Sequence, residues 1–383
     1  MTNRLCVLAF LAVCGLAALG QAQAFTVLYN FTGSSDGGNP YAGVIQDSAG
    51  KLYGTVEFGG SYPYYGAVFK VNTAGKETVL HRFAGNPDGE YPFIPVVRDS
   101  KGSLYGTTYE GGSRYYGTVF RIDGAGNEKV LHSFTGGNDG CYPMQGLVRD
   151  KAGNLYGTAS FCGSSGYGTI FKVDGSGKFS VLHSFTDGSS DGAGPYYGHL
   201  TMDKSGNLYG LTGGGGPSNY GVLYELSGNG AFAVVHRFVG GTTDGCYPLG
   251  SVTEDKAGNL YGTTEYCGSN NRGLIWAVSK TGKETILYNF EYLPSDACNP
   301  AAGVTLDSKG NLYGVTLDCG ANYGGALYQL SAADGTLTLL HSFDYKDGEG
   351  LMGEVWRTSN GALFGTTVGG GTYGHGTVWK YVP

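Results

Sequence analysis

Residues 146–185 read GLVRDKAGNLYGTASFCGSSGYGTIFKVDGSGKFSVLHSF, and this stretch decides the fold. It holds four short runs rich in β-branched and aromatic residues, at 146–150, 154–159, 168–174 and 179–185. None has the apolar spacing of a helix, and each is bounded by Gly, Asp, Asn or Ser. The stretch therefore predicts four antiparallel strands joined by two short turns and one longer loop.

The same unit recurs along the chain. Its marker, Leu-Tyr-Gly or in one case Leu-Phe-Gly, starts at Leu52, Leu104, Leu155, Leu208, Leu260, Leu312 and Leu363. A spacing of 51 to 53 residues indicates a repeat protein whose units bury their faces against their neighbours. Seven such units predict an all-β fold, a seven-bladed β-propeller with four antiparallel strands per blade. We place the repeats of this single domain at 25–76, 77–127, 128–178, 179–230, 231–283, 284–335 and 336–383.

The two ends of the repeat region predict how the ring closes. Residues 25–31 resemble the fourth strand of a unit, yet no first three strands precede them. Residues 376–381 resemble a third strand, and no fourth strand follows before Pro383. We therefore expect the N-terminal strand to complete the last blade and remove an exposed sheet edge. An open solenoid, which would not need this pairing, is the alternative.

Residues 1–24 have the pattern of a secretory signal peptide, with Arg4, an apolar run at 5–19 and Ala-Gln-Ala at 22–24. The run is too short to cross a bilayer, and no later stretch approaches the roughly 18 apolar residues of a transmembrane helix. The formal net charge is −7, and losing Arg4 makes it −8. Nucleic acid is an unsuitable partner, because phosphate binding needs clustered Lys and Arg. We expect a secreted monomer, periplasmic or extracellular, without a cofactor.

The six cysteines of the repeats predict three disulfides: Cys141 with Cys162, Cys246 with Cys267, and Cys298 with Cys319. Each pair flanks an Asp-x-x-Gly turn symmetrically, so a regular hairpin places its members directly opposite each other, about 4.5 to 5.5 Å apart between Cα atoms. The other four units lack both cysteines; the matching positions are Gly38 and Gly59, Glu90 and Gly111, Ala193 and Gly214, and Glu349 and Gly370. Independent thiols would not vary together in this way, and a zinc site usually gathers four ligands with His nearby. An oxidising compartment agrees with the pairing.

Two more repeated positions carry titratable groups. The first is an Asp that precedes the first strand of each unit, at Asp36, Asp88, Asp139, Asp191, Asp244, Asp296 and Asp347. Calcium binding is one interpretation, but one carboxylate per loop favours a turn-capping role. The second is a His in the fourth strand, at His81, His132, His183, His236 and His341, replaced by Tyr29 and Tyr288. We expect these side chains to pack between blades rather than to bind metal or catalyse.

Three segments of the unit, VLHSFTGGNDGCYP (130–143), GLVRDKAGNLYGT (146–158) and YGTIFKVDGSGK (167–178), resemble the GloVer repeat of bacterial choice-of-anchor tandem-repeat proteins. The resemblance covers all seven units. It implies an extracellular bacterial protein of uncharacterised activity, in a family whose members often carry a C-terminal surface anchor. This sequence departs from that pattern, since it ends at Val382-Pro383 without an anchor segment.

Candidate ligand-binding residues lie on the face that carries the long loops, which the disulfides would make rigid. Tyr offers a flat apolar ring and one hydroxyl, suited to stacking on sugars or anchoring a protein contact. The predicted binding residues are Tyr64, Tyr65, Tyr91, Tyr115, Tyr116, Tyr142, Tyr167, Tyr197, Tyr247, Arg272 and Trp356. The favoured function is a non-catalytic binding or scaffold propeller for carbohydrate, cell-envelope or protein ligands.

An enzyme is the alternative, because chemistry needs groups that break the repeat. Glu354 and His199 replace a small residue at the start of the first strand, and His375 precedes Gly376. Glu354 and His375 share a blade and would suit acid–base chemistry in a polysaccharide lyase or hydrolase. Sequence drift in the end blade explains the same residues without any catalysis.

Overall fold

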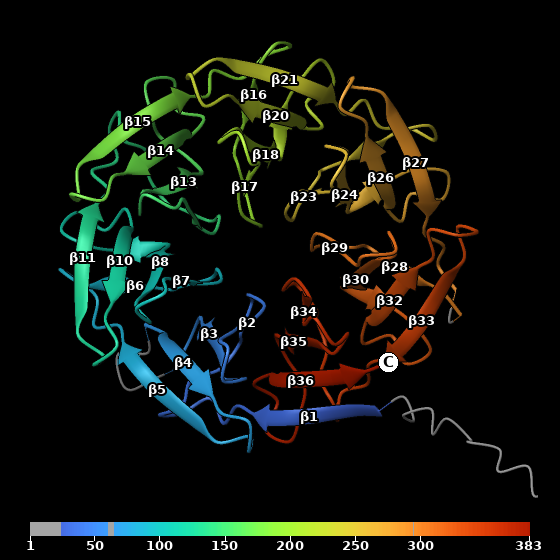
Figure 1. Cartoon of the computed structure of the whole chain (residues 1–383), viewed down its shortest axis with the longest axis horizontal. Coiled ribbons are helices and arrows are strands. Elements are labelled where there is room, and N and C mark those ends of the chain that lie inside the picture. Colours follow the sequence, from blue (N-terminus) through green and yellow to red (C-terminus); the bar gives the residue numbers. More distant parts are fainter. Residues whose placement is uncertain (1–23, 60–64, 294) are drawn as a thin grey trace, which may run out of the picture.

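The computed structural model describes residues 24–59, 65–293 and 295–383. Over these ranges the chain forms seven four-stranded antiparallel sheets. The sheets stand around a common axis as the blades of a β-propeller (Figure 1). The predicted fold class is confirmed.

Each blade runs from a short strand at the axis to a long strand at the rim. The first strands are β2 (Ile45–Gln46), β7 (Val97–Arg98), β12 (Val148–Arg149), β17 (Thr201–Met202), β23 (Thr253–Glu254), β29 (Thr305–Leu306) and β34 (Trp356–Arg357). The second strands are β3 (Leu52–Val56), β8 (Leu104–Thr108), β13 (Leu155–Ala159), β18 (Leu208–Thr212), β24 (Leu260–Thr264), β30 (Leu312–Thr316) and β35 (Leu363–Thr367). The third strands are β4 (Ala67–Val71), β10 (Thr118–Ile122), β14 (Thr169–Val173), β20 (Val222–Leu226), β26 (Leu274–Val278), β32 (Ala326–Leu330) and β36 (Thr377–Val382). The fourth strands are β5 (Glu77–Arg82), β11 (Glu128–Ser133), β15 (Phe179–Ser184), β21 (Phe232–Arg237), β27 (Glu284–Asn289), β33 (Leu337–Ser342) and β1 (Ala24–Asn30).

Because the strands alternate in direction, the connections divide between two faces of the ring. Short turns link the first strand to the second and the third to the fourth, and we call their side the turn face. The longer connections lie on the opposite side, the loop face. Four two-stranded ribbons form there: β6 (Gly89–Glu90) with β9 (Glu110–Gly111), β16 (Gly192–Ala193) with β19 (Gly214–Gly215), β22 (Gly245–Cys246) with β25 (Tyr266–Cys267), and β28 (Ala297–Cys298) with β31 (Asp318–Cys319).

The Asp-x-x-Gly turns set the register of the first two strands. Asp150 N–H donates to the Asn154 carbonyl and Gly153 N–H donates to the Asp150 carbonyl, at 3.0 and 3.1 Å. Gly153 has a φ of +91°, which is the left-handed residue of a bulged three-residue hairpin loop. The extra residue shifts the pairing by one, so that Val148 faces Tyr156.

The core fills the gaps between neighbouring blades. Its largest members are aromatic rings at one position of the third strands, all with no exposed surface: Phe69, Phe120, Phe171, Tyr224, Trp276, Tyr328 and Trp379. The Leu-Tyr-Gly glycines lie beneath these rings, because a Cβ on Gly157 would come within 2.7 Å of the Phe171 ring. This close approach explains why Gly ends the repeat marker in all seven units.

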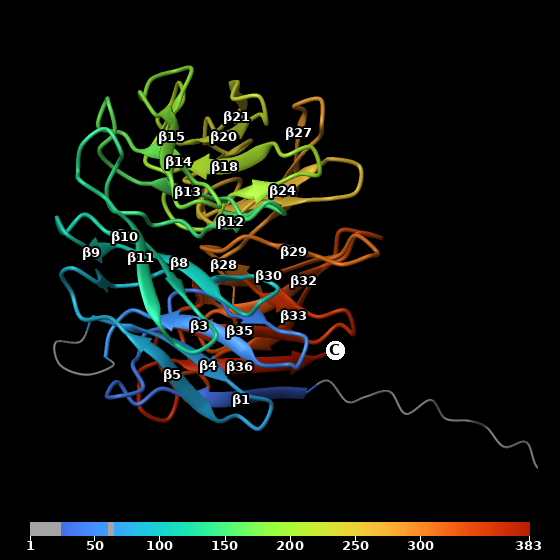
Figure 2. The ribbon, with the colours of Figure 1, turned by 60° about the vertical axis from the view of Figure 1, so that its left-hand side comes forward.

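The N-terminal strand closes the ring as predicted. β1 pairs with β36 in antiparallel register, with Ala24 opposite Val382 and Thr26 opposite Lys380. The two strands lie side by side in both views (Figures 1 and 2). The last blade therefore takes its fourth strand from the start of the repeat region, and its outer edge lies at the rim like that of every other blade.

Candidate functional site

Three disulfides join connections on the loop face. Cys141–Cys162, Cys246–Cys267 and Cys298–Cys319 have Cα separations of 5.4, 5.5 and 5.4 Å. The partners are those the sequence predicts, but the register is not: Cys141 lies opposite Phe161 because of the bulged turn. Three disulfides indicate an oxidising, extracytoplasmic environment.

The second cysteine of each pair has a left-handed backbone, with φ of +61° to +67° at Cys162, Cys267 and Cys319. The blades without cysteine carry Gly at this position, as at Gly59 and Gly111. In the fourth blade the left-handed residue is Gly215, one position later than the Gly214 expected from the sequence. A cysteine here accepts backbone strain that Gly avoids, and the crosslink offsets it.

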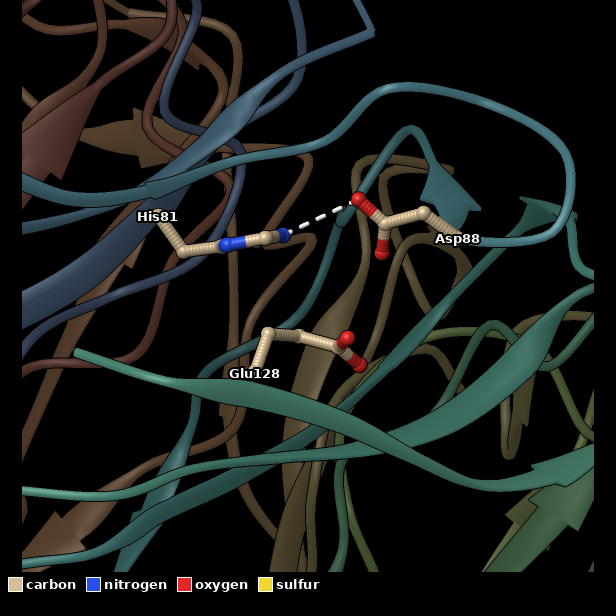
Figure 3. Close-up of side chains that lie close together, drawn as sticks. All are labelled: His81, Asp88 and Glu128. Atoms are coloured by element: carbon tan, nitrogen blue, oxygen red, sulfur yellow. Dashed lines mark hydrogen bonds and ion pairs between the residues drawn. The ribbon is translucent and has the colours of Figure 1, made fainter.

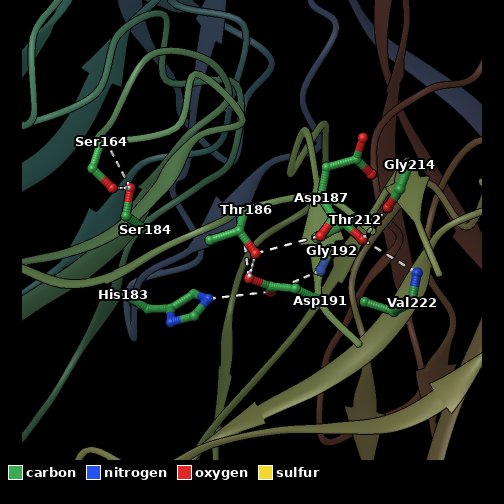
Figure 4. Close-up of polar contacts among 10 residues, drawn as sticks. All are labelled: Ser164, His183, Ser184, Thr186, Asp187, Asp191, Gly192, Thr212, Gly214 and Val222. Carbon is green, nitrogen blue, oxygen red and sulfur yellow. Dashed lines mark hydrogen bonds and ion pairs between the residues drawn. The ribbon is translucent and has the colours of Figure 1, made fainter. Parts of the chain in front are cut away.

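A His–Asp or Tyr–Asp contact recurs at all seven blade junctions. The pairs are Tyr29 with Asp36, His81 with Asp88, His132 with Asp139, His183 with Asp191, His236 with Asp244, Tyr288 with Asp296 and His341 with Asp347. Asp191 also accepts hydrogen bonds from Thr186 N–H at 3.0 Å and Gly192 N–H at 2.8 Å (Figure 4). Each carboxylate thus caps the loop that leads into the next blade.

Several tyrosines on the loop face have an unusual backbone conformation. Tyr91, Tyr142 and Tyr247 have φ of +57°, +55° and +54°, a conformation that is rare for a bulky residue. Tyr142 N–H donates to the Tyr116 carbonyl at 2.9 Å, and the Tyr142 carbonyl accepts from Ser160 N–H at 3.2 Å. Because both bonds cross between loops, these residues are fixed in place before any ligand arrives.

The loop face contains a cavity of about 570 Å³ between the third, fourth and fifth blades. Five aromatic side chains line it: Phe161, Tyr167, Tyr196, Tyr247 and Tyr266. We call this the aromatic groove. Phe161, Tyr167, Tyr247 and Tyr266 are each 38 to 41% exposed, so part of each ring is open to a ligand. Tyr196 and Tyr266 belong to the tyrosine-rich loops but are not among the predicted binding residues.

Asp187, Asn219 and Glu265 lie among these rings, together with Ser160, whose hydroxyl donates to the Pro195 carbonyl. Burial raises the pKa of Glu265, and a hydrogen bond from Tyr266 opposes the increase. Asn219 Oδ1 accepts from Gly215 N–H at 2.8 Å, which fixes the orientation of its amide. The groove thus combines flat apolar faces with a few oriented hydrogen-bonding groups, the usual composition of a small-ligand site.

A second cavity, about 680 Å³, follows the propeller axis. Tyr41, Phe93 and Tyr197 line it, together with Trp356 and Arg357. The repeat-breaking residues His199 and Glu354 also lie here, from the fourth and seventh blades. Their side chains meet across the axis, with His199 Nδ1 3.5 Å from Glu354 Oε2.

Ser251 joins this pair and is not among the predicted residues. Its Oγ lies 2.6 Å from His199 Nδ1, and its N–H donates to Glu354 Oε1 at 2.9 Å. Ser251 is only 3% exposed. The same imidazole nitrogen faces both the hydroxyl and the carboxylate, whereas a catalytic relay uses the two ring nitrogens separately. The three groups therefore brace the first strands against each other.

His375 lies elsewhere. Its peptide pairs with Gly370, and its ring packs so closely on Gly33 that a Cβ there would come within 2.4 Å. The structure thus places Glu354 beside His199 and Ser251, not beside the His375 of its own blade. The predicted pairing of Glu354 with His375 is therefore wrong. Glu354 instead contacts residues from two other blades.

A family model for the Gloeobacter/Verrucomicrobia repeat matches residues 17–202, 100–305 and 196–383. The three overlapping matches together span nearly the whole chain. The chain belongs to the Gloeobacter/Verrucomicrobia repeat family. No curated protein matches it. Within the described ranges, this repeat protein has no helix with the length and apolar character that a bilayer crossing requires.

Solved structures share the fold of this family member at low sequence identity. One is described as the extracellular domain of the putative hybrid two component system BT3049 from B. thetaiotaomicron, with 13% identity and a TM-score of 0.61. Another, the extracellular domain of BT4673 from the same organism, has 12% identity and a TM-score of 0.58. They align with 94% and 93% of this chain, which spans 41% and 39% of theirs.

The remaining predicted binding residues of this Gloeobacter/Verrucomicrobia repeat protein lie outside the aromatic groove. Tyr65 and Tyr116 pack over Gly85 and Gly136, and Arg272 lies over the Tyr292 ring at 4.4 Å. Tyr115 is 57% exposed. Tyr64 lies outside the described residues. The structure thus divides the predicted set into packing residues, isolated exposed rings, and the groove and axial-cavity residues Tyr167, Tyr247, Tyr197 and Trp356.

Proposed function

We propose that this protein is an extracytoplasmic, non-catalytic binding module that recognises carbohydrate through the aromatic groove. The observation that carries the proposal is the cluster of five aromatic rings around a cavity of about 570 Å³. The disulfide Cys246–Cys267 fixes the loops that carry Tyr247 and Tyr266. A rigid groove loses little entropy when a ligand binds.

The chemistry of the groove fits a sugar. Tyrosine rings present flat apolar faces to the C–H side of a pyranose and keep a hydroxyl for polar contacts. Asp187, Asn219 and Glu265 supply hydrogen-bonding groups for the sugar hydroxyls. Two carboxyl groups in the groove and a net charge of −7 favour a neutral glycan over a polyanionic one.

The proposed location is the periplasm or the cell exterior, with residues 1–24 acting as the export signal. The three disulfides support this location, as does the shared fold with domains described as extracellular parts of two-component systems. A neutral cell-envelope or environmental polysaccharide is the ligand class that this location and the groove favour together. A protein ligand on the same face is the competing candidate.

A glycan array, with neutral and acidic oligosaccharides, tests the proposal directly. Binding should be found among the neutral glycans, and calorimetry on the strongest of them should show at least about tenfold weaker binding for Tyr167→Ala and Tyr266→Ala. Tyr115→Ala is the matched control, because this ring is exposed on a loop outside the groove. An array without any binding, or equal losses in Tyr115→Ala and the groove variants, would overturn the proposal.

A further inference from the structure

Two blade junctions bring a third potential metal ligand to the His–Asp contact. At the first, His81 Nε2 on β5 lies 3.0 Å from Asp88 Oδ2. Glu128, on β11 of the next blade, turns its carboxylate to the same point (Figure 3). One ligand atom from each of these three residues lies within 4.8 Å of the others.

The second junction repeats this arrangement three blades further on. His236 Nε2 lies 3.4 Å from Asp244 Oδ1 and 3.7 Å from Glu284 Oε1. Glu284 begins β27 in the same way that Glu128 begins β11. The same three repeat positions therefore gather the same three side chains twice.

Other junctions keep the His–Asp contact but place an aromatic ring where the glutamate stands. Phe179 stacks on His132 with ring centroids 3.7 Å apart, and Phe232 stacks on His183 at 3.9 Å. At these junctions the Phe that begins the neighbouring outer strand stacks on the imidazole. The His–Asp contact thus serves the fold, and glutamate is an addition at particular junctions.

The two glutamates are costly additions unless something satisfies them. Glu128 Oε1 and Glu284 Oε1 are buried and accept no hydrogen bond from the described part of the chain. A buried carboxylate oxygen without a hydrogen bond loses its hydration without compensation. A cation held between the three side chains would remove this cost.

A third junction has the glutamate but lacks the imidazole. Glu77 begins β5, and its Oε1 is buried without a hydrogen bond from the described residues, as at the other two glutamates. Tyr29 takes the place of the histidine there and donates its hydroxyl to Asp36 at 2.8 Å. A protonated phenol is a poor metal ligand, so this junction is a natural control in which two carboxyl groups meet without a nitrogen donor.

We propose that the His81–Asp88–Glu128 and His236–Asp244–Glu284 clusters are two binding sites for a divalent transition-metal ion, with zinc as the ion of choice. One imidazole nitrogen and two carboxylate oxygens are a donor set that zinc accepts, with water completing the tetrahedron. Calcium is unsuitable, since it takes six or more oxygens. The first cluster opens to solvent at the rim, where the His81 and Asp88 side chains are 19% and 16% exposed, and the second is more closed, with the Asp244 side chain 5% exposed. Each ion would tie the outer strand of one blade to that of the next.

This proposal departs, at His81 and His236, from the expectation from the sequence that the repeated histidines pack rather than bind metal. Packing describes the junctions with a stacked Phe, such as His132 and His183. The residue that begins the neighbouring outer strand decides between packing and metal binding. Because neither cluster contributes a residue to the lining of the aromatic groove, carbohydrate binding and metal binding can fail independently.

The test uses tag-free, disulfide-intact protein stripped with chelator and titrated with zinc chloride by calorimetry, with elemental analysis after dialysis. The wild type should bind two zinc ions per chain, and its thermal midpoint should rise with zinc. Glu128→Phe/Glu284→Phe should bind none and show no rise, while staying folded because Phe occupies this position at other junctions.

A second variant keeps the test informative if the Phe variant fails to fold. His81→Tyr/His236→Tyr copies the natural junctions at Tyr29 and Tyr288, and it should also lose both ions. Folded wild type that binds no zinc, or a folded variant that still binds two ions, would overturn the proposal.

Discussion

The ring of Phe25 stacks on the imidazole of His341, with centroids 3.7 Å apart and an interplanar angle of 4°. Phe25 belongs to β1, which completes the last blade, whereas His341 belongs to β33 of the blade before it. The contact therefore repeats, across the point of ring closure, the Phe–His stacking seen between consecutive blades at His132 and His183. β1 therefore packs against the neighbouring blade through the same contact that internal outer strands make.

This contact predicts a stability loss for Phe25→Ala. The ring also meets Phe343 and Trp379, at 5.2 and 6.2 Å between centroids. Because Phe25 is only partly buried, we expect the unfolding free energy to fall by about 2 kcal/mol, below the range for a fully buried Phe. Guanidinium denaturation measures the change. Leu182→Ala, at an exposed position of an outer strand, should change stability by less than about 1 kcal/mol, and an equal loss in both variants would contradict the assigned role of Phe25.

The disulfides predict a second stability difference. Replacing Cys141 and Cys162 by Ser opens a loop of 21 residues and should lower the unfolding free energy by about 3 kcal/mol. Cys141→Ser/Cys162→Gly should recover about 0.5 to 1 kcal/mol of this loss, because Gly adopts the left-handed backbone without strain. Denaturation under non-reducing conditions compares the two variants. A Gly variant less stable than the Ser variant would show that the left-handed conformation is not strained.

Glu57 predicts a pH dependence. Its side chain is 7% exposed, and burial raises its pKa to about 7 from an ordinary value of 4.5. Below the ordinary pKa the folded and unfolded states both bind the proton; between the two pKa values only the folded state holds it, so stability falls as pH rises. The loss saturates above the raised pKa at no more than about 3.5 kcal/mol, at about 1.4 kcal/mol per pKa unit. The unfolding free energy, measured by denaturation from about pH 4.5 to 8, should fall less for Glu57→Gln than for the wild type, by up to this amount. An equal fall in both proteins would refute the raised pKa of Glu57.

The loop cap at Asp191 predicts a local effect. This carboxylate accepts from His183 and from the Thr186 and Gly192 amides, so Asp191→Ala leaves the buried Gly192 amide and two partly buried donors without a partner. We expect a loss of about 2 to 4 kcal/mol, together with faster proteolysis of the 186–191 loop. Asp191→Asn keeps one acceptor oxygen and should lose less. Equal stability of Asp191→Ala and wild type would mean that water replaces the carboxylate without cost.

Much of the fold is predictable because the same strand pattern occurs seven times along the chain. The strand order, the closing strand and the cysteine partners all follow from that repetition. The register of Cys141 against Phe161 does not, because the left-handed Gly153 adds a bulge that a symmetric hairpin lacks. The sequence therefore predicts the cysteine partners correctly, whereas the bulge at Gly153 makes the predicted register wrong by one residue.

The axial residues show why the site is harder to predict. Glu354 and His375 share a blade, which suggests a pair, yet a propeller brings the starts of all first strands together at its axis. His199, Ser251 and Glu354 each stand nine residues before the repeat leucine, which is the signal that could have grouped them. Ser251 gives no signal by itself, because Ser resembles the small residues usual at this position.

The central claim is that a ligand occupies the aromatic groove, and hydroxyl-radical footprinting tests it most directly. With the best glycan from the array bound, oxidation of Tyr167, Tyr247 and Tyr266 should decrease, because these rings are exposed only until the ligand covers them. Tyr115, Tyr323 and Tyr373, which are 57 to 58% exposed on other loops, should be oxidised equally with and without glycan. Protection of these three, with the groove tyrosines unchanged, would contradict the account.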